Sequence, residues 1–287
     1  MTRINSVIRL NVSQTHQKKR KKTGGKYPGP TTSSKYWIYG KHSVFSALAN
    51  PRRVIHGILL TENCKKQIPN NILPHLKGKH LELVKRITPD KDSSSQGIAA
   101  QVTRLIQPNL EDFLQMPHKK DIDENIRAHP LSTNRNIVII LDQVQDPHNI
   151  GAIMRSAAAF GATGVITSKH HAPSENATMI KIACGGFEMV PYIQVSNIAC
   201  TISKLQEHGY FVAGLAEDAP TNLDQIDLAA NQNIAIILGS EGSGIRSLVS
   251  KRANALYKIP ILEQAKSINV SNAAAIALYA LTTPYPR

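Results

Sequence analysis

The stretch Ile137-Val138-Ile139-Ile140-Leu141-Asp142, which runs on into Gln143-Val144-Gln145-Asp146-Pro147-His148-Asn149-Ile150-Gly151, decides the fold class of this chain. Five consecutive apolar residues without polar alternation are typical of a strand that is covered on both faces. A helix is predicted directly after the loop, over residues 149–160. A buried strand followed by a helix predicts an α/β domain with a parallel sheet wrapped by helices.

The same alternation continues to the end of the chain. Apolar runs predict further strands at residues 165–167, 190–195, 210–215, 234–238 and 256–261. Helical patterns fill the intervals at residues 177–183, 197–208, 245–251 and 270–281. Residues 136–287 are therefore expected to form one parallel-sheet domain.

The chain upstream of this domain divides into three parts. Residues 37–106 predict a small α/β module, with helices at 43–48 and 72–76 and strands at 54–60 and 97–102. Residues 107–135 are polar and irregular, so we expect a linker that holds one helical turn at 110–114. Residues 1–36 are expected to form a disordered basic arm, because residues 1–34 contain no Asp or Glu and too little apolar surface to fold.

The charge of the chain points to its partner. Lys and Arg number 34 against 20 Asp and Glu, a formal net charge of +14. This balance predicts a polyanionic partner, with nucleic acid as the first candidate. The charge favours an arm that grips RNA phosphates, while a solubilising tail and a mitochondrial transit peptide stay open. The expected location is the cytoplasm, with the mitochondrial matrix as the alternative.

Two classes of protein are excluded by composition. The 287 residues contain no run of about 18 apolar residues, which a membrane-spanning helix requires, so no membrane partner is expected. The three cysteines, Cys64, Cys184 and Cys200, are widely spaced and odd in number. Such spacing makes neither a disulfide framework nor a zinc site, so we expect a reducing compartment and no metal.

Three loops at the ends of predicted strands carry polar residues where an α/β sheet binds its ligand. The first places Asn149 at a helix start and Arg155 as the one charge in a helix of small and apolar residues. The second is Gly239-Ser240-Glu241-Gly242-Ser243-Gly244, in which glycines allow close backbone approach and Glu241 adds a carboxylate. The third runs from Ile259-Pro260 to Ser267-Ile268-Asn269-Val270-Ser271. It has more hydroxyls and amides than one helix cap needs.

In this order the three segments resemble the three motifs of the SpoU family, the TrmH-type RNA ribose 2'-O-methyltransferases of the SPOUT group. Upstream, Tyr39-Gly40-Lys41 and Gln96-Gly97 resemble the ribosomal-protein-like RNA-binding domain that many of these enzymes carry. A histidine is common directly before that Gln-Gly pair, whereas this chain has Ser95.

The resemblance implies features that the pattern alone does not predict. It implies a carboxyl-terminal trefoil knot, a homodimer with a shared active site, and S-adenosylmethionine as methyl donor. By position, it implies a donor site formed by Leu238, Gly239, Gly242, Ile259, Ile268 and Ser271. It also implies a catalytic and substrate-orienting set formed by Asn149, Arg155, Glu241, Ser267 and Asn269.

The chemistry of the reaction suggests a role for Arg155. A ribose 2'-hydroxyl is a poor nucleophile, so the enzyme must align it with the methyl group and help its proton leave. Arg155 is the candidate either as a base or as a cation that stabilises negative charge on the oxygen. The second role is favoured because a guanidinium stays protonated at neutral pH. Glu241 is a candidate to orient Arg155.

Several functions stay open at this point. The leading hypothesis is 2'-O-methylation of a ribose in large-subunit ribosomal RNA, with guanosine as the expected nucleoside. The alternatives are a transfer RNA ribose 2'-O-methyltransferase and a non-catalytic RNA-binding factor of ribosome assembly with the same fold. A nucleotide-dependent oxidoreductase is disfavoured, because no GxGxxG follows the first strand of the sheet.

Overall fold

The computed structural model describes residues 35–87, 95–116, 135–228, 232–265 and 267–282. The chain divides into two compact units. The first comprises Met1–Ile106 together with Glu175–Ala177, and the second comprises the rest of the chain. Most of the expected basic arm lies outside the described residues, but its last residue, Tyr36, already belongs to a strand.

The second unit is built on a seven-stranded sheet in which every pairing is parallel. The strand order is β7-β6-β5-β10-β8-β11-β9. The bounds are β5 Ile137–Asp142, β6 Gly164–Ser168, β7 Tyr192–Val195, β8 Tyr210–Leu215, β9 Thr221–Asn222, β10 Asn233–Gly239 and β11 Ala255–Lys258. The parallel α/β sheet predicted from the apolar runs is therefore confirmed.

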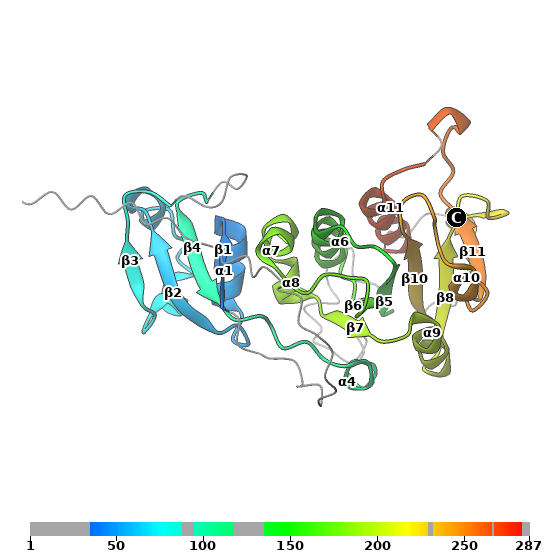
Figure 1. Ribbon diagram of the computed structural model, residues 1–287, viewed down its shortest axis with the longest axis horizontal. Helices are drawn as coiled ribbons and strands as arrows, with labels where there is room; N and C mark the ends of the chain where they lie inside the picture. Colours follow the sequence, from blue (N-terminus) through cyan, green and yellow to red (C-terminus); the bar gives the residue numbers. More distant parts are fainter. Residues whose placement is uncertain (1–34, 88–94, 117–134, 229–231, 266, 283–287) are drawn as a thin grey trace, which may run out of the picture. The chain divides into compact units, whose positions relative to one another are not determined.

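Helices cover both faces of this sheet (Figure 1). One face packs against α4 (Leu110–Leu114), α9 (Ile198–Glu207) and α10 (Ser247–Ser250). On the other side, α6 (Pro147–Ala159) contacts α7 (Ala177–Ala183), α8 (Gly186–Met189) and α11 (Val270–Thr282). Glycines permit this close packing: a Cβ at Gly186 of α8 would lie 2.5 Å from the Met154 carbonyl oxygen of α6, and a Cβ at Gly151 of α6 would lie 2.8 Å from Ile182 Cβ of α7. Short 3-10 turns form at Leu223–Gln225 and Glu263–Ala265.

The segment expected to be a linker is in part a piece of the second unit. The predicted helical turn at residues 110–114 is present as α4. Leu110 and Phe113 are buried in the core beside Ile193 and Val195, and a Cβ at Gly164 would meet the Phe113 ring. The described part of residues 107–135 therefore contributes to the core, and the remainder, 117–134, lies outside the described residues.

The first unit is a four-stranded sheet in the order β1-β4-β2-β3. Its elements are β1 Tyr36–Tyr39, α1 Lys41–Ala49, β2 Ile55–Leu60, α2 Glu62–Lys65, α3 Leu73–Leu76, β3 Leu81–Leu83 and β4 Ile98–Val102. The strands β1 and β3 and the helix α2 are absent from the elements that the sequence pattern predicted. Strand β3 was missed because its three residues are exposed at the sheet edge and carry no buried apolar pattern.

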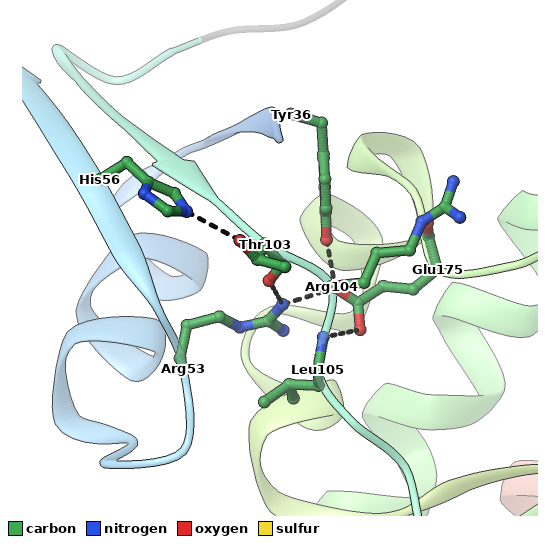
Figure 2. A network of polar contacts seen from close by, with 7 residues as sticks. All are labelled: Tyr36, Arg53, His56, Thr103, Arg104, Leu105 and Glu175. Carbon is green, nitrogen blue, oxygen red and sulfur yellow. Dashed lines mark hydrogen bonds and ion pairs between the residues drawn. The ribbon is translucent and has the colours of Figure 1, made fainter. Parts of the chain in front are cut away.

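A buried polar network joins the strands of the first unit to Glu175 (Figure 2). Arg53 is only 4% exposed and forms an ion pair with Glu175 at 2.5 Å. It also donates to the Thr103 carbonyl oxygen at 3.0 Å. The Tyr36 hydroxyl donates to the same carboxylate, and burial together with the Glu175 charge raises the pKa of Tyr36, which keeps it a neutral donor. Because a buried guanidinium requires a counter-charge, Glu175 completes this unit.

Two further expectations concern the whole chain. Among the described helices, none is both long and apolar enough to cross a bilayer. The strand order by itself does not trace the path of the carboxyl-terminal segment through a loop, so the trefoil knot stays a prediction.

Candidate active site

The candidate site lies at the carboxyl ends of two adjacent parallel strands. Strands β5 and β10 pair in register to their last residues, with Asp142 opposite Gly239. The loop after β5 leads to Asn149 in the first turn of α6, and the loop after β10 carries Glu241. A third segment, directly before α11, carries Asn269. Ligands of open α/β sheets bind at such an edge.

Side chains from the three segments form one hydrogen-bonded cluster, which we call the amide–carboxylate cluster: Asn149, Glu241 and Asn269. The Glu241 carboxylate oxygen Oε1 accepts from Asn149 Nδ2 at 2.9 Å and from Asn269 Nδ2 at 2.7 Å. Asn269 Nδ2 also approaches Asn149 Oδ1 at 3.0 Å. One residue from each of the three motifs therefore takes part in this cluster.

The orientation of Asn269 is fixed from both ends of its amide. Its Oδ1 accepts from the Ser271 backbone N–H at 2.8 Å and from the Ser271 hydroxyl at 2.5 Å. Since Nδ2 is held by the cluster, neither end of the amide is free to rotate. Asn269 therefore caps the start of α11, and Ser271, which the resemblance placed in the donor site, orients the Asn269 amide.

The loop of residues 239–246 is a tightly closed turn. A Cβ at Gly239 would lie 2.1 Å from the carbonyl carbon of Gly244, so only glycine fits at this position. The Ser240 and Ser243 hydroxyls are hydrogen-bonded at 2.6 Å, and Gly242 has a φ of +86°, which few other residues adopt. Such a loop presents backbone amides and carbonyls toward a ligand with little rearrangement.

A buried ion pair, which sequence reasoning missed, anchors the far end of this loop. Asp142 is fully buried; its Oδ2 accepts from the Arg246 backbone N–H and its Oδ1 from Arg246 Nε, each at 2.9 Å. Arg246 Nη2 lies 2.6 Å from Asp142 Oδ1. The signal in the sequence was the polar residue directly after the apolar run of β5. Its partner is 104 residues away, so the pairing itself was not readable.

Other predicted site residues are placed apart from the cluster. Arg155 is exposed on α6 and, among the residues that the structure describes, forms no ion pair with Glu241. Because Glu241 instead binds two amides, its proposed role in orienting Arg155 finds no support within one chain. Ser267 is exposed, and its backbone N–H donates to the Ala265 carbonyl oxygen at 2.6 Å. Its catalytic role stays a prediction.

The residues assigned to the donor site lie at the ends of β10 and β11 and directly before α11. Leu238 and Gly239 end β10, Ile259 follows β11, and Ile268 precedes α11. Ile261 and Leu262, in the segment between β11 and α11, expose 37% and 78% of their surface. Backbone polar groups next to exposed apolar side chains fit a ligand that has a flat base and a polar chain. Within the described ranges, no three His, Cys, Asp or Glu side chains gather into a group that could hold a metal ion.

The two motifs noted in the first unit also meet in space. The Gln96 side chain accepts from the Lys41 backbone N–H at 2.8 Å, and the Gly40 N–H donates to the Ile98 carbonyl oxygen at 3.4 Å. Gly97 has no room for a side chain, because a Cβ there would lie 2.4 Å from the Thr61 hydroxyl. Hydrogen bonds therefore hold the segment after β1, which carries the Tyr-Gly pair, next to the segment before β4, which carries the Gln-Gly pair.

Comparison with known protein families covers both units. Residues 136–279 match the SpoU rRNA Methylase family, and residues 37–108 match the RNA 2'-O ribose methyltransferase substrate-binding family. The first match contains the whole amide–carboxylate cluster, and the second contains the Tyr-Gly and Gln-Gly pairs.

Two curated relatives match along most of their length. A protein of Staphylococcus haemolyticus that is named as a TrmH family tRNA/rRNA methyltransferase is 35% identical over 247 residues, which are 84% of this chain and 93% of the relative. The 23S rRNA (guanosine-2'-O-)-methyltransferase RlmB of Coxiella burnetii is 34% identical, with the same coverage of both chains.

Solved structures share the fold. The SpoU methyltransferase AviRb from Streptomyces viridochromogenes, solved with AdoMet, has a TM-score of 0.65 at 18% identity and covers 86% of this chain and 89% of its own. An AdoMet-bound rRNA methyltransferase from Sinorhizobium meliloti has a TM-score of 0.63 at 21% identity, with 86% of each chain covered. With the motifs, the cluster and both domain matches in place, the chain belongs to the SpoU family of RNA 2'-O-ribose methyltransferases.

Proposed function

We propose that this enzyme methylates the 2'-oxygen of a ribose, that of a guanosine, in large-subunit ribosomal RNA, with S-adenosylmethionine as donor. The observation that carries the proposal is the amide–carboxylate cluster, which unites Asn149, Glu241 and Asn269 at one edge of the sheet. The likeness to RlmB along 84% of the chain supports the ribosomal substrate, and the basic net charge of +14 supports an RNA partner.

The donor fits the closed loop at Gly239. When bound, S-adenosylmethionine supplies an electrophilic methyl group on sulfonium. The chain's part is to bind it through backbone groups of residues 238–242 and between apolar side chains at residues 259 and 268. The fixed turn requires no ordering when the donor arrives, which favours affinity.

The chain's own residues then act on the ribose. Asn149 and Asn269 are held by Glu241 and Ser271, so their amides are pre-oriented hydrogen-bonding groups. We infer that Asn149 and Asn269 orient the nucleotide, and that Arg155 stabilises negative charge on the 2'-oxygen while its proton passes to solvent water. A guanidinium is always protonated in proteins, so Arg155 acts as a cation and not as a base.

A second copy of the chain is part of this proposal. Arg155 lies six residues after Asn149, about 9 Å along the α6 axis. In the part of the chain that the structure describes, it forms neither a hydrogen bond nor an ion pair with Glu241. On α11, Ile276 and Tyr279 are 43% and 48% exposed and lie one turn apart, so α11 presents an apolar face. We propose that a partner protomer covers this face and that the two protomers share each site.

The testing experiment is transfer of labelled methyl from S-adenosylmethionine to total RNA of a strain that lacks the gene, followed by mapping of alkali-resistant positions. One labelled position in large-subunit ribosomal RNA is the expected result. A labelled position in transfer RNA keeps the reaction and overturns the substrate. RNA and donor binding without any transfer overturns the enzymatic proposal in favour of an assembly factor.

Arg155→Ala tests the proposed chemistry. Turnover is expected to fall by about 10²–10³-fold, because one preorganised group that stabilises the developing charge is lost. Arg252→Ala is the matched control, since Arg252 is an exposed arginine whose side chain donates to Ser203 Oγ at 2.8 Å, away from the cluster. If donor affinity falls as much as turnover, the electrostatic role of Arg155 is wrong.

A further inference from the structure

A polar cavity lies at the carboxyl ends of β6 and β7, beside the start of α9, and we call it the β6–β7 pocket. Its volume is about 170 Å³. The polar residues that line it are Ser168, His170, His171, Ser196, Asn197 and Arg246. None of the described residues that line it is acidic. The pocket therefore presents hydrogen-bond donors without a carboxylate among its lining residues.

The start of α9 supplies two free backbone donors. Asn197 caps this ten-residue helix, and its side chain accepts from the Cys200 N–H at 3.1 Å. Among the described residues, no acceptor binds the N–H groups of Ile198 and Ala199, and both residues line the pocket. Free N–H groups at a helix start attract anions, and the helix dipole adds to the effect.

Ser168 gives an independent indication of a ligand. It is only 5% exposed, and it lies on the same face of β6 as Ile166, which packs in the core with Ile198. Its side chain therefore points toward the start of α9. In the described part of the chain the Ser168 hydroxyl has no hydrogen-bond partner, although its carbonyl oxygen accepts from Ala172 N. The Ser168 oxygen atom is not fully enclosed, so it reaches the pocket and is open to a ligand as donor or acceptor.

Arg246 contributes a fixed positive charge. Asp142 binds its backbone N–H and its Nε, so the guanidinium is held in place, while 42% of the side chain stays exposed. Nη1 makes no hydrogen bond to any described residue and is available for a ligand. A guanidinium that is already oriented loses little side-chain entropy when it binds an oxyanion.

We propose that the β6–β7 pocket binds a backbone phosphate of the RNA substrate. Helix N–H groups, a serine hydroxyl and a guanidinium are the groups that hold phosphate oxygens in nucleic-acid complexes. The pocket shares its edge of the sheet with the amide–carboxylate cluster, and β6 separates β7 from β5. The pocket and the cluster lie at the starts of helices on opposite faces of the sheet and are offset by two strand spacings, about 10 Å, along its edge, which a single RNA strand can bridge. This inference rests on the proposed RNA substrate.

The test replaces Ser196, which is exposed at the pocket, by aspartate. In Ser196→Asp a carboxylate competes with phosphate at the start of α9. We expect the KM for RNA to rise by about tenfold or more, since a charge-assisted contact is lost. We also expect the slope of log K against log salt to flatten by about 0.7. Donor affinity, measured by titration calorimetry, stays unchanged.

Ser203→Asp is the matched control. It makes the same charge change seven residues farther along the chain, within α9 and next to Arg252, whose side chain donates to Ser203. It is expected to bind RNA as the wild type does, and melting curves of both variants check that the fold is kept. Equal loss of RNA affinity in both variants overturns the pocket, because it reports only the added negative charge.

A measurement of RNA binding distinguishes the failure of the pocket proposal from the failure of the methyltransferase proposal. If the wild type binds RNA but transfers no methyl group, the methyltransferase proposal fails, while weaker RNA binding by Ser196→Asp still supports the pocket. A lower affinity for S-adenosylmethionine in this variant overturns the assignment to RNA. Inorganic phosphate is the second probe: if Ser196→Asp abolishes its binding and RNA affinity does not change, the pocket holds a free anion and the RNA proposal is overturned.

Discussion

A Cβ atom at residue 239 has no room, because the backbone of Gly244 and Ile245 lies 2.1 to 2.4 Å from its position. Gly239→Ala must therefore move the loop that carries Glu241. A displacement of about 1 Å at a catalytic group can lower the rate about 10²-fold, so kcat/KM is expected to fall by about this factor. Steady-state kinetics, together with the melting temperature, measure the effect.

Gly57→Ala is the control for Gly239→Ala. A Cβ at Gly57 meets nothing within 4 Å, and its φ lies outside the left-handed region. Its activity is expected to equal that of the wild type. If Gly239→Ala also retains full activity, the tight turn is not required for the reaction.

At the scale of elements, the sequence predicted those strands and site residues that a local run of apolar residues or a helix start marks. The strands β5, β8 and β10 were readable because each is a run of apolar residues with little polar interruption. Asn149, Glu241 and Asn269 were readable because each follows such a run or starts a helix. The sequence did not predict the ion pairs Asp142–Arg246 and Arg53–Glu175, because the two residues of each pair lie 104 and 122 positions apart in the chain.

The buried pair of Arg53 and Glu175 tests what holds the first unit together. Glu175→Gln leaves a guanidinium that is 4% exposed without its counter-charge. Removal of one partner of a buried pair costs about 3–5 kcal/mol, so the free energy of unfolding of this unit is expected to fall by about that much. Urea unfolding, followed by the fluorescence of Trp37, measures it.

The exposed pair of Lys204 and Glu111 in the second unit is the comparison for the buried pair, and circular dichroism follows the unfolding of both variants. Both side chains are exposed, at 45% and 60%, and solvent screens their attraction. Glu111→Gln is therefore expected to leave stability within experimental error. A similar small effect for Glu175→Gln would contradict the structural role assigned to the buried network.

At the scale of the whole molecule, charge is concentrated at the amino terminus. Residues 1–34 contain eight Lys and Arg and no acidic residue. If this arm binds RNA phosphates, a variant that lacks residues 1–34 is expected to bind RNA more weakly and with a flatter salt dependence. An unchanged slope of log K against log salt would assign the arm another role.

The proposed sharing of the site between two protomers makes the sharpest prediction for the assembly. If Arg155 of one protomer acts beside Asn269 of its partner, Arg155→Ala and Asn269→Ala homodimers are both inactive. A mixed dimer then holds one site with both residues intact and one site with neither. Because a two-fold dimer has two equivalent sites, random mixing of equal amounts is expected to restore about a quarter of the wild-type activity.

Two measurements make this complementation decisive. Light scattering gives the mass of each species, and Tyr279→Glu places a charge on the apolar face of α11, so it is expected to yield monomers without activity. If each site belonged to one protomer, every site in a mixed dimer would still lack one residue and mixing would restore nothing. Restoration by mixing therefore requires that Arg155 and Asn269 reach the same ribose from different chains.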